Sequence, residues 1–171
     1  ADIVLANDPD ADRIGVHVKD NKTGEYILFN GNMIGLTVAE YLITNQREKG
    51  ILPQNPALIK TIVSSNMADQ ICKKNGVALY EVLTGFKNIA AKIREFEADN
   101  SHKCIMGYEE SYGCLIGDHA RDKDGIIVDM LLAEAAAYYK TKGMTLWDAM
   151  LEMYKKYGYY REAQVSIVME G

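Results

Sequence analysis

The stretch ALIKTIVSSNMADQICKKNGVALYEVL, residues 57–83, decides the fold class, because it combines an apolar strand, a helix and a second apolar strand. The run over 57–65 is typical of a buried strand, the pattern over 67–75 is helical and stops at Gly76, and 77–83 is apolar again. Two strands joined by such a helix need a crossover connection, which makes them parallel. The stretch therefore predicts a β–α–β unit.

The same alternation extends in both directions. Strands are expected over 2–8, 14–20, 25–30 and 103–109, with a hairpin turn at 21–24. Helices are expected from 30–32 to Gly50, and over 86–98, 126–141 and 145–157. We therefore predict an α/β fold of the three-layer α/β/α type, with a mostly parallel mixed sheet flanked by helices. Residues 1–160 are expected to form one domain, and 161–171 a β-like linker toward a missing domain.

Composition excludes several classes of protein. The 171 residues are 48% hydrophobic and carry a formal net charge of -5 without a dense Lys/Arg tract, which argues against nucleic acid or an anionic membrane as a partner. No apolar run approaches the roughly 18 residues that span a bilayer, so we expect a soluble, cytoplasmic protein.

The three cysteines, Cys72, Cys104 and Cys114, lack C-x-x-C spacing and are expected to be reduced packing residues. The chain opens on Ala1 inside a strand, so we expect a piece of a larger protein.

Three aspartates, Asp8, Asp10 and Asp12, follow the first apolar strand at every second position. Either an extended chain or a tight loop would bring these carboxylates together, and their mutual repulsion calls for a cation. Three hard oxygen ligands suit Mg²⁺, and the adjacent Arg13 could bind a phosphate that shares the metal. A calcium-binding EF-hand is excluded because a loop counted from Asp8 has Arg13 and Lys19 where Gly and Glu are needed. A phosphatase of the haloacid dehalogenase type and a solvated turn remain alternatives.

A second polar cluster, MGYEESYGCLIGDHARDKDG, occupies residues 106–125 between a strand and a helix. Its glutamates and serine are groups that hold sugar hydroxyls, while its histidine, arginine and lysine suit phosphate binding or proton transfer. Asp124 could equally be a helix N-cap, and Glu110 could be solvated. In the turn LTGFKN, residues 83–88, Lys87 could face a ligand or cover the surface.

The motifs DPDADR, TIVSSNMAD, LTGFK, GYEESYG and DHARDKDG, in this order, resemble the α-D-phosphohexomutases, most closely the bacterial α-phosphoglucomutase branch. The resemblance spans about residues 1–160 and implies the third of four domains, with the metal loop at 7–13 and the sugar-specificity loop at 107–113. It implies an enzyme that interconverts hexose 1-phosphate and hexose 6-phosphate through a phosphoserine. The expected ligands are glucose 1-phosphate, glucose 6-phosphate and glucose 1,6-bisphosphate.

The resemblance also implies roles for individual residues. Asp8, Asp10 and Asp12 would bind Mg²⁺, and Arg13, His119 and Lys123 would support phosphate or move a proton. The substrate-binding set would be Thr84, Gly85, Lys87, Glu109, Ser111 and Arg121. Two departures stand out: the metal loop reads Asp-Pro-Asp-Ala-Asp instead of Asp-Gly-Asp-Gly-Asp, and no serine has the surroundings of the family's phosphoserine loop. A non-catalytic cation-binding module is therefore a further alternative.

Overall fold

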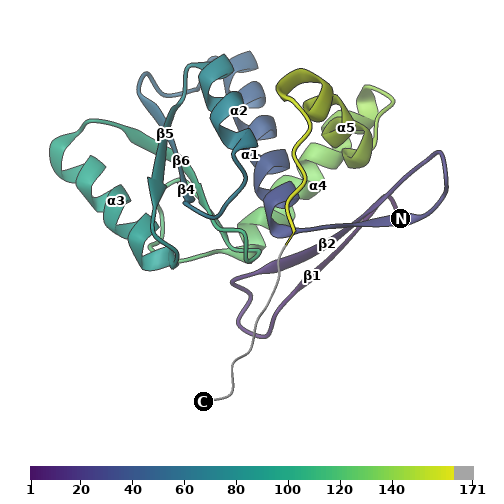
Figure 1. Cartoon of the computed structure of the whole chain (residues 1–171), viewed down its shortest axis with the longest axis horizontal. Coiled ribbons are helices and arrows are strands. Elements are labelled where there is room, and N and C mark those ends of the chain that lie inside the picture. Colours follow the sequence, from purple (N-terminus) through teal and green to yellow (C-terminus); the bar gives the residue numbers. More distant parts are fainter. Residues whose placement is uncertain (164–171) are drawn as a thin grey trace.

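The computed structural model describes residues 1–163, which form two β-sheets and five helices (Figure 1). The strands are β1 (Ile3–Asn7), β2 (Ile14–Lys19), β3 (Tyr26–Phe29), β4 (Pro56–Thr61), β5 (Ala78–Val82), β6 (Lys103–Tyr108) and β7 (Cys114–Ile116). The helices are α1 (Gly31–Glu48), α2 (Met67–Asn75), α3 (Phe86–Asp99), α4 (Gly125–Thr141) and α5 (Leu146–Tyr157).

The larger sheet has four strands in the order β5-β4-β6-β7. Strand β4 runs parallel to both β5 and β6, and β7 is antiparallel to β6. Helix α3 covers one face, where Ile89, Ile93 and Phe96 pack against Ile59, while α1 and α2 lie on the other face (Figure 1). This arrangement confirms the predicted α/β/α fold with a mixed sheet.

The first three strands form a separate antiparallel sheet in the order β1-β2-β3. Ile14, Val16 and Val18 on β2 point into the main core and are at most 1% exposed. The predicted hairpin is therefore present, but its strands do not join the parallel sheet. The short connections between these strands explain why they pair antiparallel with one another.

Side-chain caps determine where three of the helices begin. The Asn30 side chain accepts a hydrogen bond from the Met33 N–H at the start of α1. Asp124 does the same for the Ile127 N–H at the start of α4, so this residue is an N-cap. Thr145 and Asp148 form a reciprocal capping box at α5. The caps at Asp124 and Thr145 were recognisable from the sequence, and the expected starts at residues 126 and 145 lie within one residue of the observed Gly125 and Leu146.

Two strand expectations differ from the structure. Strand β4 ends at Thr61 rather than at residue 65, because Ser64 closes a turn by donating its N–H to the Thr61 carbonyl at 3.0 Å. Ile62 and Val63 continue the apolar run but are each 52% exposed. Strand β7 was not predicted, since three residues are too few for a recognisable alternation. From residue 164 onward, the β-like run expected over 161–171 lies outside the described residues.

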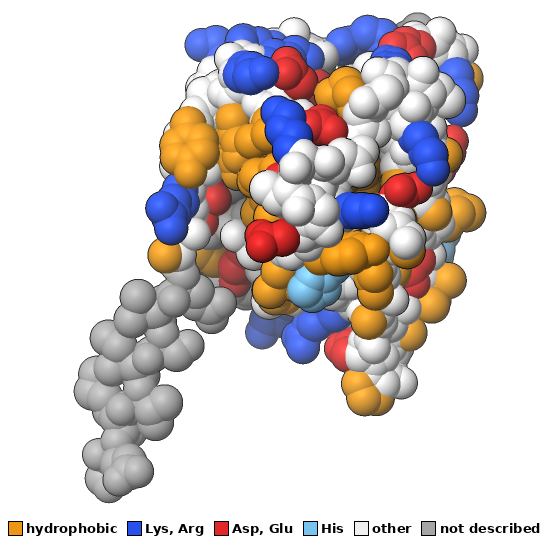
Figure 2. Space-filling model, turned by 90° about the vertical axis from the view of Figure 1, so that its right-hand side faces the viewer, with side chains coloured by type: hydrophobic (Ala, Val, Ile, Leu, Met, Phe, Trp, Pro, Cys, Tyr) orange, Lys and Arg blue, Asp and Glu red, His pale blue; other side chains and the backbone are white. Residues whose placement is uncertain are grey.

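The distribution of charge on the surface and the burial of the cysteines bear on the expectations from composition. On the face in Figure 2, Lys and Arg side chains are interspersed with Asp and Glu and form no single basic patch. Among residues 1–163, no helix has the length and apolar character needed to cross a membrane.

The three cysteines, Cys72, Cys104 and Cys114, are free and buried, and burial raises the pKa of each thiol to about 12. They are packing residues, as predicted.

Candidate functional site

The loop between β1 and β2 brings the three aspartates together. One carboxylate oxygen from each of Asp8, Asp10 and Asp12 lies within 4.8 Å of the others. The loop is tight rather than extended, because the Asp8 carboxylate accepts the Arg13 N–H at 3.1 Å and the Asp8 carbonyl accepts the Ala11 N–H at 3.0 Å. Ala11 adopts a φ of 56°, which helps to reverse the chain. Of the two geometries open from sequence, the structure has the loop.

These carboxylates are suited to a hard cation. The Oδ1 atom of Asp12 is buried and accepts no hydrogen bond among the described residues, and the Arg13 Nε atom, at 3.9 Å, is too far away to donate one. A metal ion bound at this oxygen would offset the cost of burying it. Oxygens bound to one octahedral Mg²⁺ at its usual ligand distance lie roughly 3–4 Å apart. The observed limit of 4.8 Å between the three oxygens is close to that spacing. The donor set fits Mg²⁺, which remains a prediction for this chain.

The second polar cluster lies directly against the aspartate loop. Arg13 forms an isolated antiparallel bridge with Gly113, and the Ile14 N–H donates to the Tyr112 carbonyl at 3.3 Å. At the start of α4, the Gly125 N–H donates to the Ala11 carbonyl at 3.0 Å. A Cβ at Gly125 would lie 2.8 Å from that carbonyl oxygen, so only glycine allows the helix to approach this closely.

Lys123 connects the two clusters through its side chain. Its Nζ lies 2.8 Å from Oδ2 of Asp12, and the side chain is only 11% exposed. Burial alone would lower its pKa, but hydrogen bonds to Asp12 and Asp122 hold the pKa above the usual value. On its other side is Gly113, where a Cβ would lie 2.2 Å from the Lys123 side chain and 3.0 Å from Oε1 of Glu109. Lys123 thus lays its aliphatic stem against Gly113 of the second cluster and pairs its ammonium with Asp12 of the aspartate loop.

Beyond Glu109, loops from several elements surround a groove of about 490 Å³. We call it the loop groove. The residues that line it are Asn30, Asn32, Val63, Thr84, Glu110, Tyr112, Glu162 and Ala163. Thr84 was predicted as a substrate-binding residue, and it belongs to the same turn as Gly85 and Lys87. The two asparagines were not predicted. Their signal was the Asn-Gly-Asn turn before α1, which indicated only a helix start.

Two predicted residues face other partners. His119 contacts the Asp124 carboxylate through Nε2 at 3.0 Å and the Ile116 carbonyl through Nδ1 at 3.1 Å. Although burial raises the pKa of Asp124, hydrogen bonds from His119 and from helix α4 hold it below the usual value. Arg121 pairs with Glu97 of α3 at 2.5 Å. In this structure the side chains of His119 and Arg121 therefore bind residues at the end of the second polar cluster. Contact with a substrate would require them to leave these partners.

The close contact between α1 and the sugar loop gives a stability prediction. A Cβ on Gly31 would lie 2.0 Å from the Glu110 carbonyl oxygen, which belongs to the backbone and cannot rotate away. Gly31→Ala should lower the free energy of unfolding by about 3 kcal/mol, because overpacking outweighs the gain of about 1 kcal/mol in helix propensity. Urea denaturation measures this change. Gly15→Ala is the control, since its Cβ would meet its nearest atom at 3.7 Å and should not destabilise the chain; equal stability of both variants would contradict the prediction.

Comparison with known proteins bears on the chemistry of this site. Residues 30–157 match the family described as phosphoglucomutase/phosphomannomutase, α/β/α domain III. The chain belongs to the α-D-phosphohexomutase superfamily. The superfamily match begins at Asn30, after the three-stranded sheet and the aspartate loop. The predicted domain limit at residue 160 and the assignment of the metal loop to the same domain remain predictions.

Relatives with phosphohexomutase names match the whole chain. A phosphoglucomutase of Staphylococcus haemolyticus is 37% identical over 171 residues, and one of Staphylococcus aureus is 36% identical. In both cases the match covers 100% of this chain and 30% of the relative, so the chain spans under a third of their length. Their names therefore describe longer proteins.

Solved structures show the same fold. A phosphoglucomutase/phosphomannomutase family protein of Burkholderia thailandensis superposes with a TM-score of 0.65 at 19% identity, covering 90% of this chain and 29% of its own. N-acetylphosphoglucosamine mutase of Aspergillus fumigatus, solved with GlcNAc-6P and magnesium, gives 0.61 at 19% identity, covering 87% and 32%. At these identities the likeness shows the fold alone.

Proposed function

We propose that this chain is the metal-binding and sugar-recognition part of a longer phosphoglucomutase or phosphomannomutase. The longer enzyme would interconvert hexose 1-phosphate and hexose 6-phosphate through a phosphoserine and a bisphosphate intermediate. The observation that carries the proposal is the contact between the two predicted loops: Arg13 forms a bridge with Gly113, and Lys123, whose stem lies against Gly113, pairs with Asp12 at 2.8 Å. One site thereby combines groups for a cation, a phosphate and sugar hydroxyls.

The metal-binding part of the proposal rests on Asp8, Asp10 and Asp12 as ligands of Mg²⁺. When bound, Mg²⁺ would neutralise charge on a phosphoryl group. The Aspergillus fumigatus mutase, a protein of the same fold, was solved in complex with magnesium, which supports this choice of cation. Within the chain, the choice of a cation is supported by the buried Oδ1 atom of Asp12, which accepts no hydrogen bond among the described residues.

Two basic side chains are placed to act on a phosphate near the aspartates. The Arg13 side chain is 49% exposed and its Nε is 3.9 Å from Asp12, so most of the guanidinium is free to bind a phosphate bidentately. The raised pKa of Lys123 keeps its Nζ protonated, which suits it to stabilise negative charge on a phosphate better than to donate a proton. His119 remains a candidate for proton transfer, with its present bond to Asp124 as the competing interaction.

The sugar hydroxyls would be held by Glu109 and Ser111. Thr84, which lines the loop groove, its neighbours Gly85 and Lys87, and Arg121 complete the proposed substrate-binding set. The ligand would be a hexose phosphate such as glucose 1-phosphate, glucose 6-phosphate or glucose 1,6-bisphosphate. The Aspergillus fumigatus mutase, solved in one structure with GlcNAc-6P and, as a serine-to-alanine variant, in another with glucose 1,6-bisphosphate, supports this ligand class. Neither of the alternatives left open by the sequence, the haloacid dehalogenase type and the cation-binding module, gains support from the relatives named above.

Substitution of Glu109 tests the sugar assignment. In the longer enzyme, Glu109→Gln should lower kcat/KM by about ten- to a hundredfold, because it removes a charge-assisted hydrogen bond of very roughly 1.5–3 kcal/mol. Magnesium affinity should be unchanged, because the three aspartates are intact. Steady-state kinetics and magnesium titration measure the two effects. Glu152→Gln, on the far helix α5, is the matched control, and kinetics of Glu109→Gln equal to that control would remove the assignment.

A further inference from the structure

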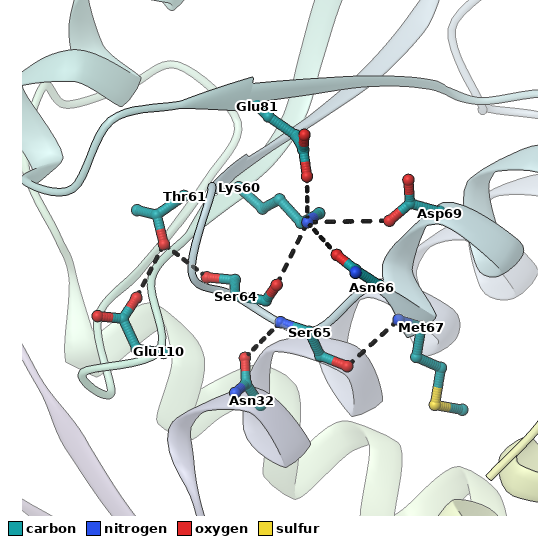
Figure 3. A network of polar contacts seen from close by, with 10 residues as sticks. All are labelled: Asn32, Lys60, Thr61, Ser64, Ser65, Asn66, Met67, Asp69, Glu81 and Glu110. Atoms are coloured by element: carbon teal, nitrogen blue, oxygen red, sulfur yellow. Dashed lines mark hydrogen bonds and ion pairs between the residues drawn. The ribbon is translucent and has the colours of Figure 1, made fainter. Parts of the chain in front are cut away.

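The hydroxyl of Thr61, at the end of β4, connects the sugar loop to the β4–α2 turn (Figure 3). It donates to Oε2 of Glu110 at 2.8 Å and lies 2.8 Å from the Ser64 hydroxyl. A threonine hydroxyl has one proton, and an ionised carboxylate can only accept, so that proton is directed to Glu110. Ser64 must then donate to Thr61. The result is a directed chain of hydrogen bonds from Ser64 through Thr61 to Glu110, here called the relay.

A buried ammonium holds the other end of the relay. Lys60 is 0% exposed, and its Nζ donates to the Ser64 carbonyl and to the Asn66 side chain, each at 3.3 Å. Glu81 at 2.5 Å and Asp69 at 3.8 Å supply its counter-charges (Figure 3). A buried charge with this many partners tolerates little displacement, because each lost contact would leave it unpaired. Ser64 is consequently held through both its carbonyl and its hydroxyl.

Glu110 itself lies between the two residues proposed to hold the sugar, Glu109 and Ser111. Among the described residues, its bond to Thr61 is the only side-chain hydrogen bond made by residues 109–113. The loop is also held by backbone contacts, including the Glu109 N–H donating to the Gly113 carbonyl at 2.9 Å and the bridge between Arg13 and Gly113, and by the packing of Tyr112 against the core. The relay is therefore the one side-chain hydrogen bond, among the described residues, that adds to these contacts in orienting the loop.

We propose that Glu110 is a positioning residue, which the relay from Lys60, Ser64 and Thr61 fixes so that Glu109 and Ser111 face the sugar. This inference rests on the proposed function. It assigns Glu110 to the support of the loop through Thr61, and it gives the TIVSS segment, residues 61–65, a task that its sequence did not reveal. Substrate selectivity would then depend on loop orientation as well as on the groups that touch the sugar.

Three threonine variants test the relay. Thr61→Val keeps the side-chain shape and removes the hydroxyl, while Thr61→Ser keeps the hydroxyl. Thr37→Val is the matched control, because Thr37 is also 0% exposed but its hydroxyl has no hydrogen-bond partner among the described residues. Amide hydrogen exchange is measured on the 171-residue chain, and kcat and KM for glucose 1-phosphate on the longer enzyme.

We expect Thr61→Val to accelerate exchange of the 109–113 amides about tenfold or more, since the loop loses its side-chain anchor. Its kcat should fall by about tenfold with a smaller change in KM, because misoriented groups lose their hold mainly in the transition state. Thr61→Ser should restore both values, and Thr37→Val should leave both unchanged.

Three other outcomes are informative. Exchange and kinetics of Thr61→Val equal to those of the unaltered protein would overturn the inference and leave the proposed function intact. Faster exchange with unchanged kinetics would also overturn it, because the relay would then serve stability alone. A longer protein without any mutase activity would instead overturn the proposed function and, with it, the sugar-positioning role.

Discussion

Asp12→Asn is expected to lower kcat/KM of the longer mutase about a thousandfold, or by about 4 kcal/mol of transition-state stabilisation. Asparagine keeps the shape of the side chain but removes one of three charges within 4.8 Å of each other, and with it most of the attraction for a divalent cation. It also removes the ion pair with Lys123 at 2.8 Å. Both the cation site and the neighbouring ammonium would thus be affected.

Thermal unfolding of the 171-residue chain separates loss of the site from loss of the fold. In the absence of magnesium, Tm of Asp12→Asn should not fall appreciably, because relief of repulsion among the aspartates offsets the lost ion pair. The rise in Tm that millimolar Mg²⁺ produces in the unaltered chain should disappear. Asp2→Asn is the control, since it also removes a carboxylate 2.7 Å from a lysine but lies outside the loop. An unchanged magnesium response in Asp12→Asn would refute the assignment of the metal ligands.

The 171-residue chain on its own is expected to show no mutase turnover. The proposed reaction requires a serine that carries the phosphoryl group while the sugar bisphosphate turns around. Ser64 and Ser65 are each only 3% exposed, and the Ser64 hydroxyl is engaged in the relay. Ser111 lies in the loop proposed to hold the sugar. A cation site and a sugar-binding loop without a phosphoryl carrier could bind substrate weakly but could not complete the exchange.

The assay for this prediction is conversion of glucose 1-phosphate to glucose 6-phosphate with Mg²⁺ and a catalytic amount of glucose 1,6-bisphosphate. A full-length Staphylococcus aureus phosphoglucomutase provides the positive control under the same conditions. Turnover by the purified chain, free of host mutase, would show that it is a complete enzyme. The proposal that it is one part of a longer mutase would then be wrong.

Much of the fold was predictable because its signals are local. Apolar runs marked the strands, 3.6-residue periodicity marked the helices, and caps such as Thr145 are recognised within one turn of chain. The separation into two sheets was not predictable. Strand β2 pairs with both β1 and β3, and only the packing of its inner face against the helices shows that these three strands stand apart from the parallel sheet.

The candidate residues were selected from the sequence, whereas the contacts among them were not predictable. The three aspartates, Lys123 and Glu109 could be selected from motif order, because each motif contains a recognisable set of chemical groups. The relay was missed because Thr61 and Ser64 look like ordinary residues at a strand end. His119 and Arg121 carried the right chemistry, but their pairing with Asp124 and Glu97 depends on how the loop folds back.

The sequence by itself determined the α/β class, the order of the elements, the helix starts and the identity of the polar clusters, because these follow from residues within a few positions of one another. Tertiary structure alone decided which clusters meet. Lys123 reaches Asp12 across more than a hundred residues of sequence, and Thr61 reaches Glu110 across 49. Such pairs form because strand ends and helix starts converge at one edge of the packed layers, and no local propensity encodes that convergence.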